Sequence, residues 1–262
     1  MSYPKKQGLY DPKNEKENCG IGFVANMNGR ATHEIIRQGI EVLNKLEHRG
    51  ACGSDPLTGD GAGLLIQMPH KFFKSQCPKI DIELPEQGKY GTGLVFFPKD
   101  VRIHSFLDIF NKIIKQEGLS LLGWRKVPVD NTTIGHVARE AEPEIWQPFI
   151  AQGKNPIDQE ELERRLYKVR KLVGKEIHYA GEAEYFVSFY ICSLSTRTFC
   201  YKGQLMSNQL ETYFLDLKDP EIESALALVH SRYSTNTFPS WGRAQPMRLI
   251  AHNGEINTVR GN

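Results

Sequence analysis

Three short stretches of the sequence carry side chains that together could hydrolyse an amide. They are Cys19-Gly20, His230-Ser231-Arg232 and His252-Asn253-Gly254. A thiol is a nucleophile, an arginine fork binds a carboxylate, and a side-chain amide beside a glycine N–H stabilises an oxyanion. One substrate that has both a carboxylate and an amide would use all three stretches.

Each stretch has a simpler interpretation when it is taken alone. A cysteine in a strand is usually inert and buried, an arginine at a strand end is usually a surface charge, and Asn-Gly is usually a tight turn. Three histidines, His48, His230 and His252, precede motif residues without carboxylates at ligand spacing. We therefore predict neither a metal site nor a Cys-His dyad.

A further glycine cluster, Gly59, Gly61 and Gly63, resembles a phosphate-binding loop only superficially. The Lys-Ser/Thr that would follow such a loop is missing, and so is a complete G-x-G-x-x-G pattern. We interpret the cluster as a turn before a strand.

The composition limits the class of protein. The chain has 262 residues, 40% of them hydrophobic, which is enough for one large domain or two small ones with a core. Lys and Arg number 33 against 31 Asp and Glu, so the net charge of +2 creates no broad field for nucleic acid or an anionic membrane. We expect neither of these partners.

The cysteines and the first residues indicate the compartment. Five cysteines, an odd number without a C-x-x-C pair, are expected to be free thiols in a reducing compartment; they are Cys19, Cys52, Cys77, Cys192 and Cys200. Residues 1–18 are polar and lack the apolar centre of a secretion signal. Without an apolar run long enough for a membrane span, a cytoplasmic location is expected.

The hydrophobic pattern predicts strands at both ends of the chain and helices between them. Strands are expected at 19–26, 63–68, 93–97, 121–129, 185–195, 198–203, 225–234 and 247–255, with 198–203 as the hairpin partner of 185–195. Helices are expected at 32–48, with Thr32 as N-cap, and at 106–114, 158–177 and 207–217. Residues 143–156 are interpreted as a connection. This order favours stacked sheets covered by helices.

Four segments resemble the amidotransferase domain of glutamate synthase large chains. They are ENCGIGFVAN, LNKLEHRGACGSDPLTGDGAG, LVHSRYSTNTFPSW and IAHNGEINTVRGN. The TGDGAG segment distinguishes this family from other class II amidotransferases, which share only Cys-Gly, His-Arg-Gly and Asn-Gly. The resemblance spans nearly the whole chain.

The resemblance implies an α+β fold of the N-terminal-nucleophile (Ntn) hydrolase class, an αββα sandwich of two antiparallel sheets between helical layers. Residues 1–18 would be a leader removed on maturation, and 19–262 a class II glutamine amidotransferase domain that continues beyond 262 in the family. The α-amine freed at Cys19, with a pKa of about 7.7 to 8.0, would then serve as base for a thiol whose pKa is about 8.5.

The resemblance also implies roles for individual residues. Cys19 would attack the side-chain amide of L-glutamine, while Asn253 and Gly254 hold the oxyanion. Arg232 would bind the α-carboxylate, and Arg49 and Gly50 would lie on a loop that closes over the substrate. The expected pocket walls are Thr235, Asn236 and Trp241, for which ordinary packing is an equal alternative.

For the whole enzyme, the resemblance implies synthase domains in the same polypeptide, FMN, an iron–sulfur cluster and, in some members, a small electron-donating subunit. No residue of this chain is expected to bind a cofactor or metal. The family's Asp for the substrate ammonium lies beyond Asn262, and the electron donor stays open. The alternatives are a class II amidotransferase with another ammonia acceptor, or a non-catalytic glutamine-binding module.

Overall fold

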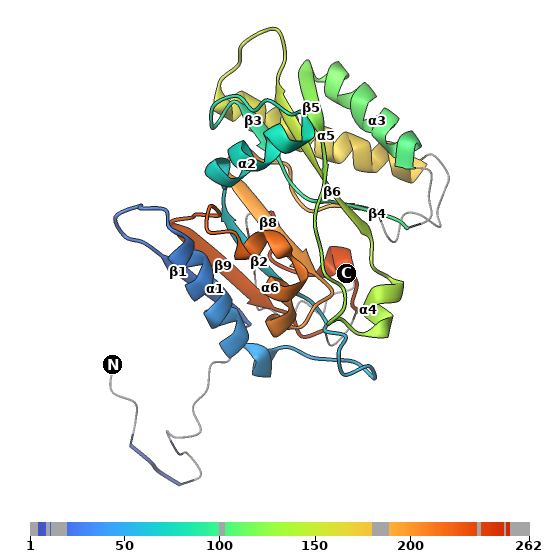
Figure 1. Ribbon diagram of the computed structural model, residues 1–262. Coiled ribbons are helices and arrows are strands. Elements are labelled where there is room, and N and C mark those ends of the chain that lie inside the picture. The colour runs from blue at the N-terminus through green and yellow to red at the C-terminus, as the bar shows by residue number, and fades with distance from the viewer. Residues whose placement is uncertain are drawn as a thin grey trace.

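The computed structural model describes residues 5–8, 11, 20–99, 103–179, 189–234, 237–248 and 250–251, with the side chains of 178–179 left aside (Figure 1). Two antiparallel sheets dominate it, and helices flank them. The α+β class with two antiparallel sheets, expected from the sequence, is confirmed.

The first sheet has four strands in the order β1-β9-β2-β8. Their bounds are β1 (Ile21–Ala25), β2 (Ala62–Gln67), β8 (Thr198–Gly203) and β9 (Leu226–Ser231). Helix α1 (His33–Lys45) covers one face and buries its apolar stripe there. The helix packs very close to the sheet at Gly39, where an added Cβ would lie only 2.7 Å from the Cβ of Ala227.

The second sheet has five strands, and β6 is its centre. The strands are β3 (Tyr90–Thr92), β4 (Val95–Phe97), β5 (Leu119–Lys126), β6 (Glu144–Gln152) and β7 (Tyr190–Ile191). Successive side chains of a strand point to opposite faces, so β4 contributes to two cores: Phe96 to one and Val95 and Phe97 to the other. The second core is closed by α3 (Ile103–Gln116) and α5 (Gln159–Tyr179), which lie on the side away from α1 (Figure 1).

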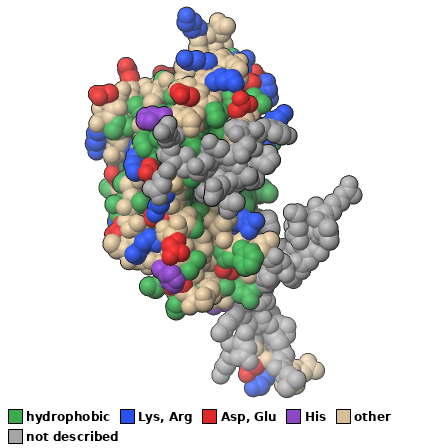
Figure 2. All heavy atoms as spheres, turned by 90° about the vertical axis from the view of Figure 1, so that its right-hand side faces the viewer, with side chains coloured by type: hydrophobic (Ala, Val, Ile, Leu, Met, Phe, Trp, Pro, Cys, Tyr) green, Lys and Arg blue, Asp and Glu red, His purple; other side chains and the backbone are tan. Residues whose placement is uncertain are grey.

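Short helices lie in the connections around the strands. They are η2 (Glu47–Arg49), α2 (His70–Gln76), η3 (Cys77–Ile80), α4 (His136–Glu140), η4 (Ser207–Gln209), α6 (Leu210–Tyr213), η5 (Leu215–Lys218) and η6 (Trp241–Arg243). Of these, α2 and η3 lie in the connection from the first sheet to the second. A buried ion pair fixes η5 against β5, because Arg125 donates to both carboxylate oxygens of Asp216 at 2.8 and 2.6 Å. No helix in the described part of the chain has the length and apolarity that a membrane crossing requires. Basic and acidic side chains are interspersed on the face in Figure 2.

The connection expected at 143–156 is wrong, because β6 occupies most of it. This strand contains a proline at position 148, which is unusual inside a central strand. It is tolerated because β4 pairs with residues 144–146 of β6 and β3 pairs with residues 149–151, which leaves a gap in the ladder at 147–148 on that side.

The hairpin expected between 185–195 and 198–203 is also wrong. The described part of the first segment, β7, pairs with β4 in the five-stranded sheet, whereas β8 pairs with β2 in the other. Glu163 of α5 fixes the crossing between them, because its carboxylate accepts hydrogen bonds from Ser195 Oγ, Thr196 N and Thr196 Oγ1 at 2.6–2.8 Å. A clamp from a distant helix leaves no local signal in the sequence.

Two smaller expectations also change. The helix at 207–217 is reduced to α6 between two 3₁₀ turns, and the Gln209 side chain caps the first turn by accepting the Met206 N–H at 2.8 Å. Thr32 occupies the N-cap position of α1 as expected, but its side chain makes no capping hydrogen bond, and its backbone pairs with Ser224. Of the strand expected at 247–255, the structure describes only a bridge between Met247 and Ile250, and the remainder lies outside the described residues.

Candidate active site

The ends of three neighbouring strands bring the sequence motifs together. The Ser231 N–H at the end of β9 donates to the Gly20 carbonyl before β1 at 2.7 Å, and the Arg232 N–H donates to the Gly61 carbonyl before β2 at 2.8 Å. The residue that follows Cys19 therefore lies beside the HSR motif and the TGDGAG segment. Antiparallel order places these termini at one edge of the sheet.

A cavity of about 160 Å³ opens at this edge, named here the strand-end cavity. Its lining includes Gly50, Asp60, Gly61, Ser207, Ser231 and Arg232. The hydroxyls of Ser207 and Ser231 are 3.0 Å apart. Glu47 and Cys52 also line it, so the cavity combines one cation, two carboxylates, two hydroxyls and a thiol, which suits a small polar ligand with charged groups.

Arg232 brings its cation to the cavity with neutral partners. Its guanidinium donates to the Asp60 carbonyl at 3.1 Å, to Ser234 Oγ at 3.1 Å and to Thr237 Oγ1 at 2.8 Å. Burial lowers the pKa of Arg232, and the charge of Asp60 partly offsets this effect. Because none of the ion pairs found among the described residues involves Arg232, its fork keeps the capacity to bind a carboxylate.

Asp60 is a site residue that the sequence analysis missed. It is 6% exposed, and its Oδ2 accepts the Ser234 N–H at 2.6 Å. Burial raises the pKa of Asp60 above its ordinary value, while the Ser234 N–H and the charge of Arg232 act against this rise. The signal was a carboxylate between two glycines directly before a strand, which we interpreted only as a turn.

The glycines around Asp60 are required by close packing of backbone segments. A Cβ on Gly59 would lie 2.3 Å from the Leu205 carbonyl oxygen, and one on Gly63 would lie 2.4 Å from that of Gln245. Gly61 has φ +142°, a backbone conformation that residues other than glycine rarely adopt. The cluster is therefore more than a turn, because it lets two other segments pack directly on the loop that carries Asp60.

The His-Arg-Gly segment reaches the cavity through Gly50. A Cβ on Gly50 would lie 2.7 Å from Ser231 Oγ, so only glycine allows this loop to approach β9 so closely. Arg49 lies in η2, and its buried Nε has no hydrogen-bond partner among the described residues. Arg49 is outside the lining of the cavity as the structure describes it. The substrate-binding roles of Arg49 and Gly50 stay predictions.

Trp241 lies in the core next to this region. It is 4% exposed, packs against Phe96 and Tyr213, and donates its Nε1–H to the Ala138 carbonyl at 3.0 Å. These contacts account for its burial by packing alone, and its role as a pocket wall stays a prediction.

The remaining predicted site residues lie outside the described residues. They are Cys19, Asn253, Gly254, Thr235 and Asn236. Three of the four described cysteines are poor nucleophiles at neutral pH, because burial raises the pKa of Cys77 and Cys200 to about 12 and that of Cys192 to about 11. Across the part of the chain that is described, no three His, Cys, Asp or Glu side chains form a group that could hold a metal.

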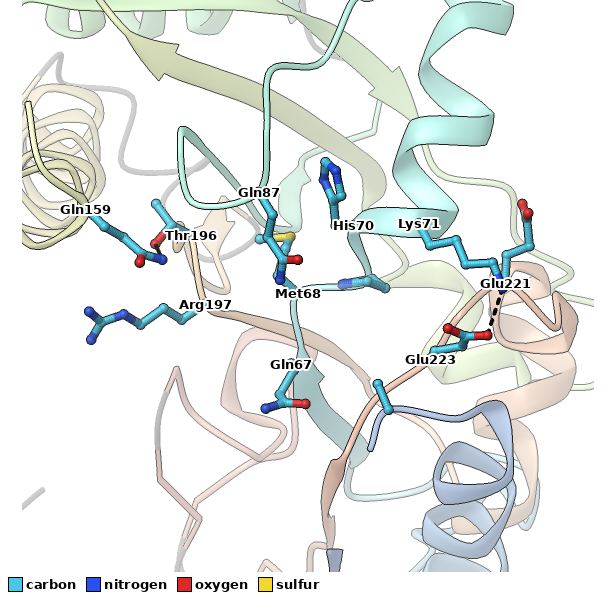
Figure 3. A pocket seen from close by; sticks show the side chains of 12 residues that line it. Gln67, Met68, His70, Lys71, Gln87, Gln159, Thr196, Arg197, Glu221 and Glu223 are labelled. Atoms are coloured by element: carbon cyan, nitrogen blue, oxygen red, sulfur yellow. Dashed lines mark hydrogen bonds and ion pairs between the residues drawn. The ribbon is translucent and has the colours of Figure 1, made fainter. Parts of the chain in front are cut away.

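A second and larger cavity, named here the polar groove, lies at the other end of β2. It has about 530 Å³ and includes Gln67, His70 and Lys71 in its lining (Figure 3). Its lysine and its arginine have ion-pair partners: Lys71 binds Glu223 at 2.8 Å, and Arg197 binds Glu160. His70 Nδ1 lies 3.0 Å from Tyr90 Oη, and burial lowers the pKa of His70. Among the residues that the structure describes, the groove therefore offers a ligand no lysine or arginine that lacks an ion-pair partner.

Known proteins share this sequence over almost its full length. Residues 19–262 match the family of class II glutamine amidotransferases. The large chain of the NADPH glutamate synthase of Bacillus subtilis is 48% identical over 260 residues, which are 99% of this chain and 17% of that protein. The NADH glutamate synthase of Schizosaccharomyces pombe is 45% identical over 99% of this chain and 12% of its own length.

A third relative has a different electron donor in its name. Ferredoxin-dependent glutamate synthase 2 of Synechocystis is 39% identical over 95% of this chain and 15% of its own length. The chain thus spans less than a fifth of the curated relatives it matches. The family match covers the cavity-forming segments 48–63 and 225–234 as well as Cys19. The chain belongs to the class II glutamine amidotransferases.

Proposed function

We propose that this chain is the glutamine-hydrolysing part of a glutamate synthase. The observation that carries the proposal is Arg232, which faces the strand-end cavity with neutral partners only, next to the backbone that follows Cys19. A guanidinium in this state is suited to the α-carboxylate of an amino acid. The similarity to glutamate synthases of three organisms supports glutamine as that amino acid.

In this proposal Cys19 becomes the first residue after residues 1–18 are removed. Its free α-amine takes the thiol proton, and the thiolate attacks the side-chain carbonyl of L-glutamine. The Asn253 side chain and the Gly254 N–H hold the resulting oxyanion, ammonia leaves, and water releases glutamate from the thioester. Arg49 and Gly50 close over the bound substrate, and Thr235, Asn236 and Trp241 contribute the walls.

Ammonia then passes to a synthase domain of the same polypeptide, where it aminates 2-oxoglutarate. FMN, an iron–sulfur cluster and a small electron-donating subunit belong to that larger enzyme, and we assign none of them to residues of this chain. We propose a cytoplasmic location for the whole. The domain assignment is a leader at 1–18 and the amidotransferase domain from 19 onwards.

The test is ammonia release from L-glutamine by the complete gene product and by Cys19→Ala, with Cys52→Ala as the control. Cys52 is the exposed described cysteine and lines the same cavity, so it is the nearest competing thiol. We expect activity in the wild type and in Cys52→Ala, and none in Cys19→Ala. Glutamine binding without ammonia release by the wild type would instead indicate a non-catalytic module.

Whether the product is used for glutamate synthesis needs a second assay. Cys19→Ala should still form glutamate from 2-oxoglutarate and free ammonia, because only the glutaminase step is lost. A complete gene product that releases ammonia but aminates a different acceptor would favour another class II amidotransferase.

A further inference from the structure

Asp60 holds the chain after β9 by several hydrogen bonds. Its Oδ2 accepts the Ser234 N–H at 2.6 Å, and its carbonyl oxygen accepts Arg232 Nη1 at 3.1 Å. The carbonyl of Gly61, the next residue, accepts the Arg232 N–H at 2.8 Å. Both ends of the segment from Arg232 to Ser234 are therefore attached to one dipeptide.

Asp60 is itself held in place through its main chain. Its backbone N–H donates to the Ala51 carbonyl at 2.9 Å, and a Cβ on Gly59 would lie 2.3 Å from the Leu205 carbonyl oxygen. On the other side, a Cβ on Gly61 would lie 3.0 Å from that of Ala244. The position of Asp60 is therefore fixed, and Asp60 can in turn fix the position of the Arg232 side chain.

Asp60 affects Arg232 through its charge but makes its side-chain hydrogen bond to a different group. The Asp60 carboxylate is near enough to Arg232 to oppose the effect of burial on that arginine, yet it bonds to a backbone N–H and leaves the guanidinium to neutral oxygens. A desolvated carboxylate also makes a stronger hydrogen bond to an N–H than an exposed one does. Asp60 can therefore stabilise a nearby cation without occupying its fork.

We propose that Asp60 is a positioning residue for substrate recognition, whose carboxylate fixes the Ser234 backbone so that Arg232 presents its guanidinium to the α-carboxylate of glutamine. This inference rests on the proposed function. In this role Asp60 acts through Arg232, so its loss weakens glutamine binding and leaves the attack of Cys19 unaffected.

The experiment measures kcat and KM for glutamine in the complete gene product with two substitutions. Asp60→Asn keeps an acceptor oxygen and the side-chain size but removes the charge, whereas Asp60→Ala removes both. Hydrogen bonds to charged groups are worth enough for us to expect KM to rise roughly tenfold to a hundredfold in Asp60→Ala. In Asp60→Asn we expect a smaller rise, and in both variants kcat should stay within about threefold of the wild type.

The matched control is Asp55→Asn in the same loop. Asp55 is also buried, at 8% exposed, but it binds Thr58 Oγ1 at 2.7 Å and the Val137 N–H at 3.2 Å, with no contact to Arg232 among the described residues. Its KM should equal that of the wild type. A rise in KM of the same size in Asp55→Asn would overturn the inference, since general loosening of the loop would then explain both results.

Other outcomes also decide the question. A fall in kcat at constant KM, or wild-type kinetics in both Asp60 variants, would overturn the inference, and so would failure of Asp60→Asn to fold. A wild-type protein without glutaminase activity would overturn the proposed function, and the inference with it. Failure of the Asp60 inference appears only in the variants, whereas failure of the proposed function appears already in the wild type. The two failures are therefore distinguishable.

Discussion

Two buried or partly buried arginines in this protein have opposite surroundings. Arg125 on β5 is 8% exposed and binds both oxygens of Asp216. Burial acts to lower the pKa of Arg125, but the hydrogen bonds and the charge of Asp216 outweigh it and raise that pKa. Arg232 binds neutral oxygens only, among the described residues, and burial lowers its pKa.

The difference indicates that Arg125 stabilises the fold, whereas Arg232 is available to bind a ligand. A buried cation that is paired with a carboxylate of the same chain already has its counter-charge. Removal of either partner leaves the other charge buried and uncompensated. A cation held only by neutral oxygens can exchange them for an incoming carboxylate. We therefore expect changes at Arg125 to alter stability and changes at Arg232 to alter substrate binding.

The largest effect is expected on stability, at the ion pair between Arg125 and Asp216. Asp216→Ala leaves the Arg125 guanidinium buried without its carboxylate, and the free energy of unfolding should fall by about 3–5 kcal/mol in urea titrations. The control is Glu160→Ala, which breaks an exposed pair with Arg197 and should cost about 0.2–1 kcal/mol. Equal losses in both variants would show that burial does not distinguish these pairs.

The next effect is expected at the cavity. Arg232→Lys keeps the charge but loses the planar fork, so KM for glutamine should rise roughly tenfold to a hundredfold. The free energy of unfolding should change by less than about 1 kcal/mol, since the lost partners are neutral. A loss of stability as large as that of Asp216→Ala, at constant KM, would make Arg232 a second arginine of the fold.

The backbone that supports Arg232 can be tested with a pair of glycines from one loop. Gly59→Ala places a Cβ 2.3 Å from the Leu205 carbonyl oxygen, whereas Gly53→Ala meets no atom within 4 Å. We expect a loss of about 1–3 kcal/mol for Gly59→Ala in urea unfolding and a change near zero for Gly53→Ala. Similar results for both would show that the loop adjusts easily.

The smallest effect is expected at the polar groove. Lys71 and Glu223 form a partly exposed pair there, and exposed pairs contribute little to stability. Lys71→Ala should therefore leave KM for glutamine unchanged and the free energy of unfolding within about 1 kcal/mol of the wild type. A rise in KM comparable to that of Arg232→Lys would move the substrate site to the larger cavity.

Local patterns in the sequence predicted individual elements well. The helical spacing of Ile36, Ile40 and Leu43 located α1, and the segment 198–203 coincides with β8. The partners of the strands were harder to predict, because β7 and β8 are neighbours in sequence and lie in different sheets. That separation depends on Glu163, a residue of α5 whose contacts no local pattern shows.

The candidate site was predicted in part. The three motif stretches identified Arg232, and the resemblance to the family implied Gly50; the structure brings both to one cavity. Asp60 was missed because its role depends on a backbone N–H of Ser234, and a main-chain partner 174 positions away has no sequence signature. The predictions for Cys19, Asn253, Gly254, Thr235 and Asn236 fall on residues outside those described.

The most direct test of the glutaminase site is covalent labelling with 6-diazo-5-oxo-L-norleucine, an electrophilic mimic of glutamine. Mass spectrometry of peptides from the labelled gene product should find the adduct on Cys19 alone among the five cysteines, and excess glutamine should prevent its formation. Burial makes the thiols of Cys77, Cys192 and Cys200 unreactive, so Cys52 is the one described competitor. An adduct on Cys52 or Cys192, with Cys19 unmodified, would contradict the account.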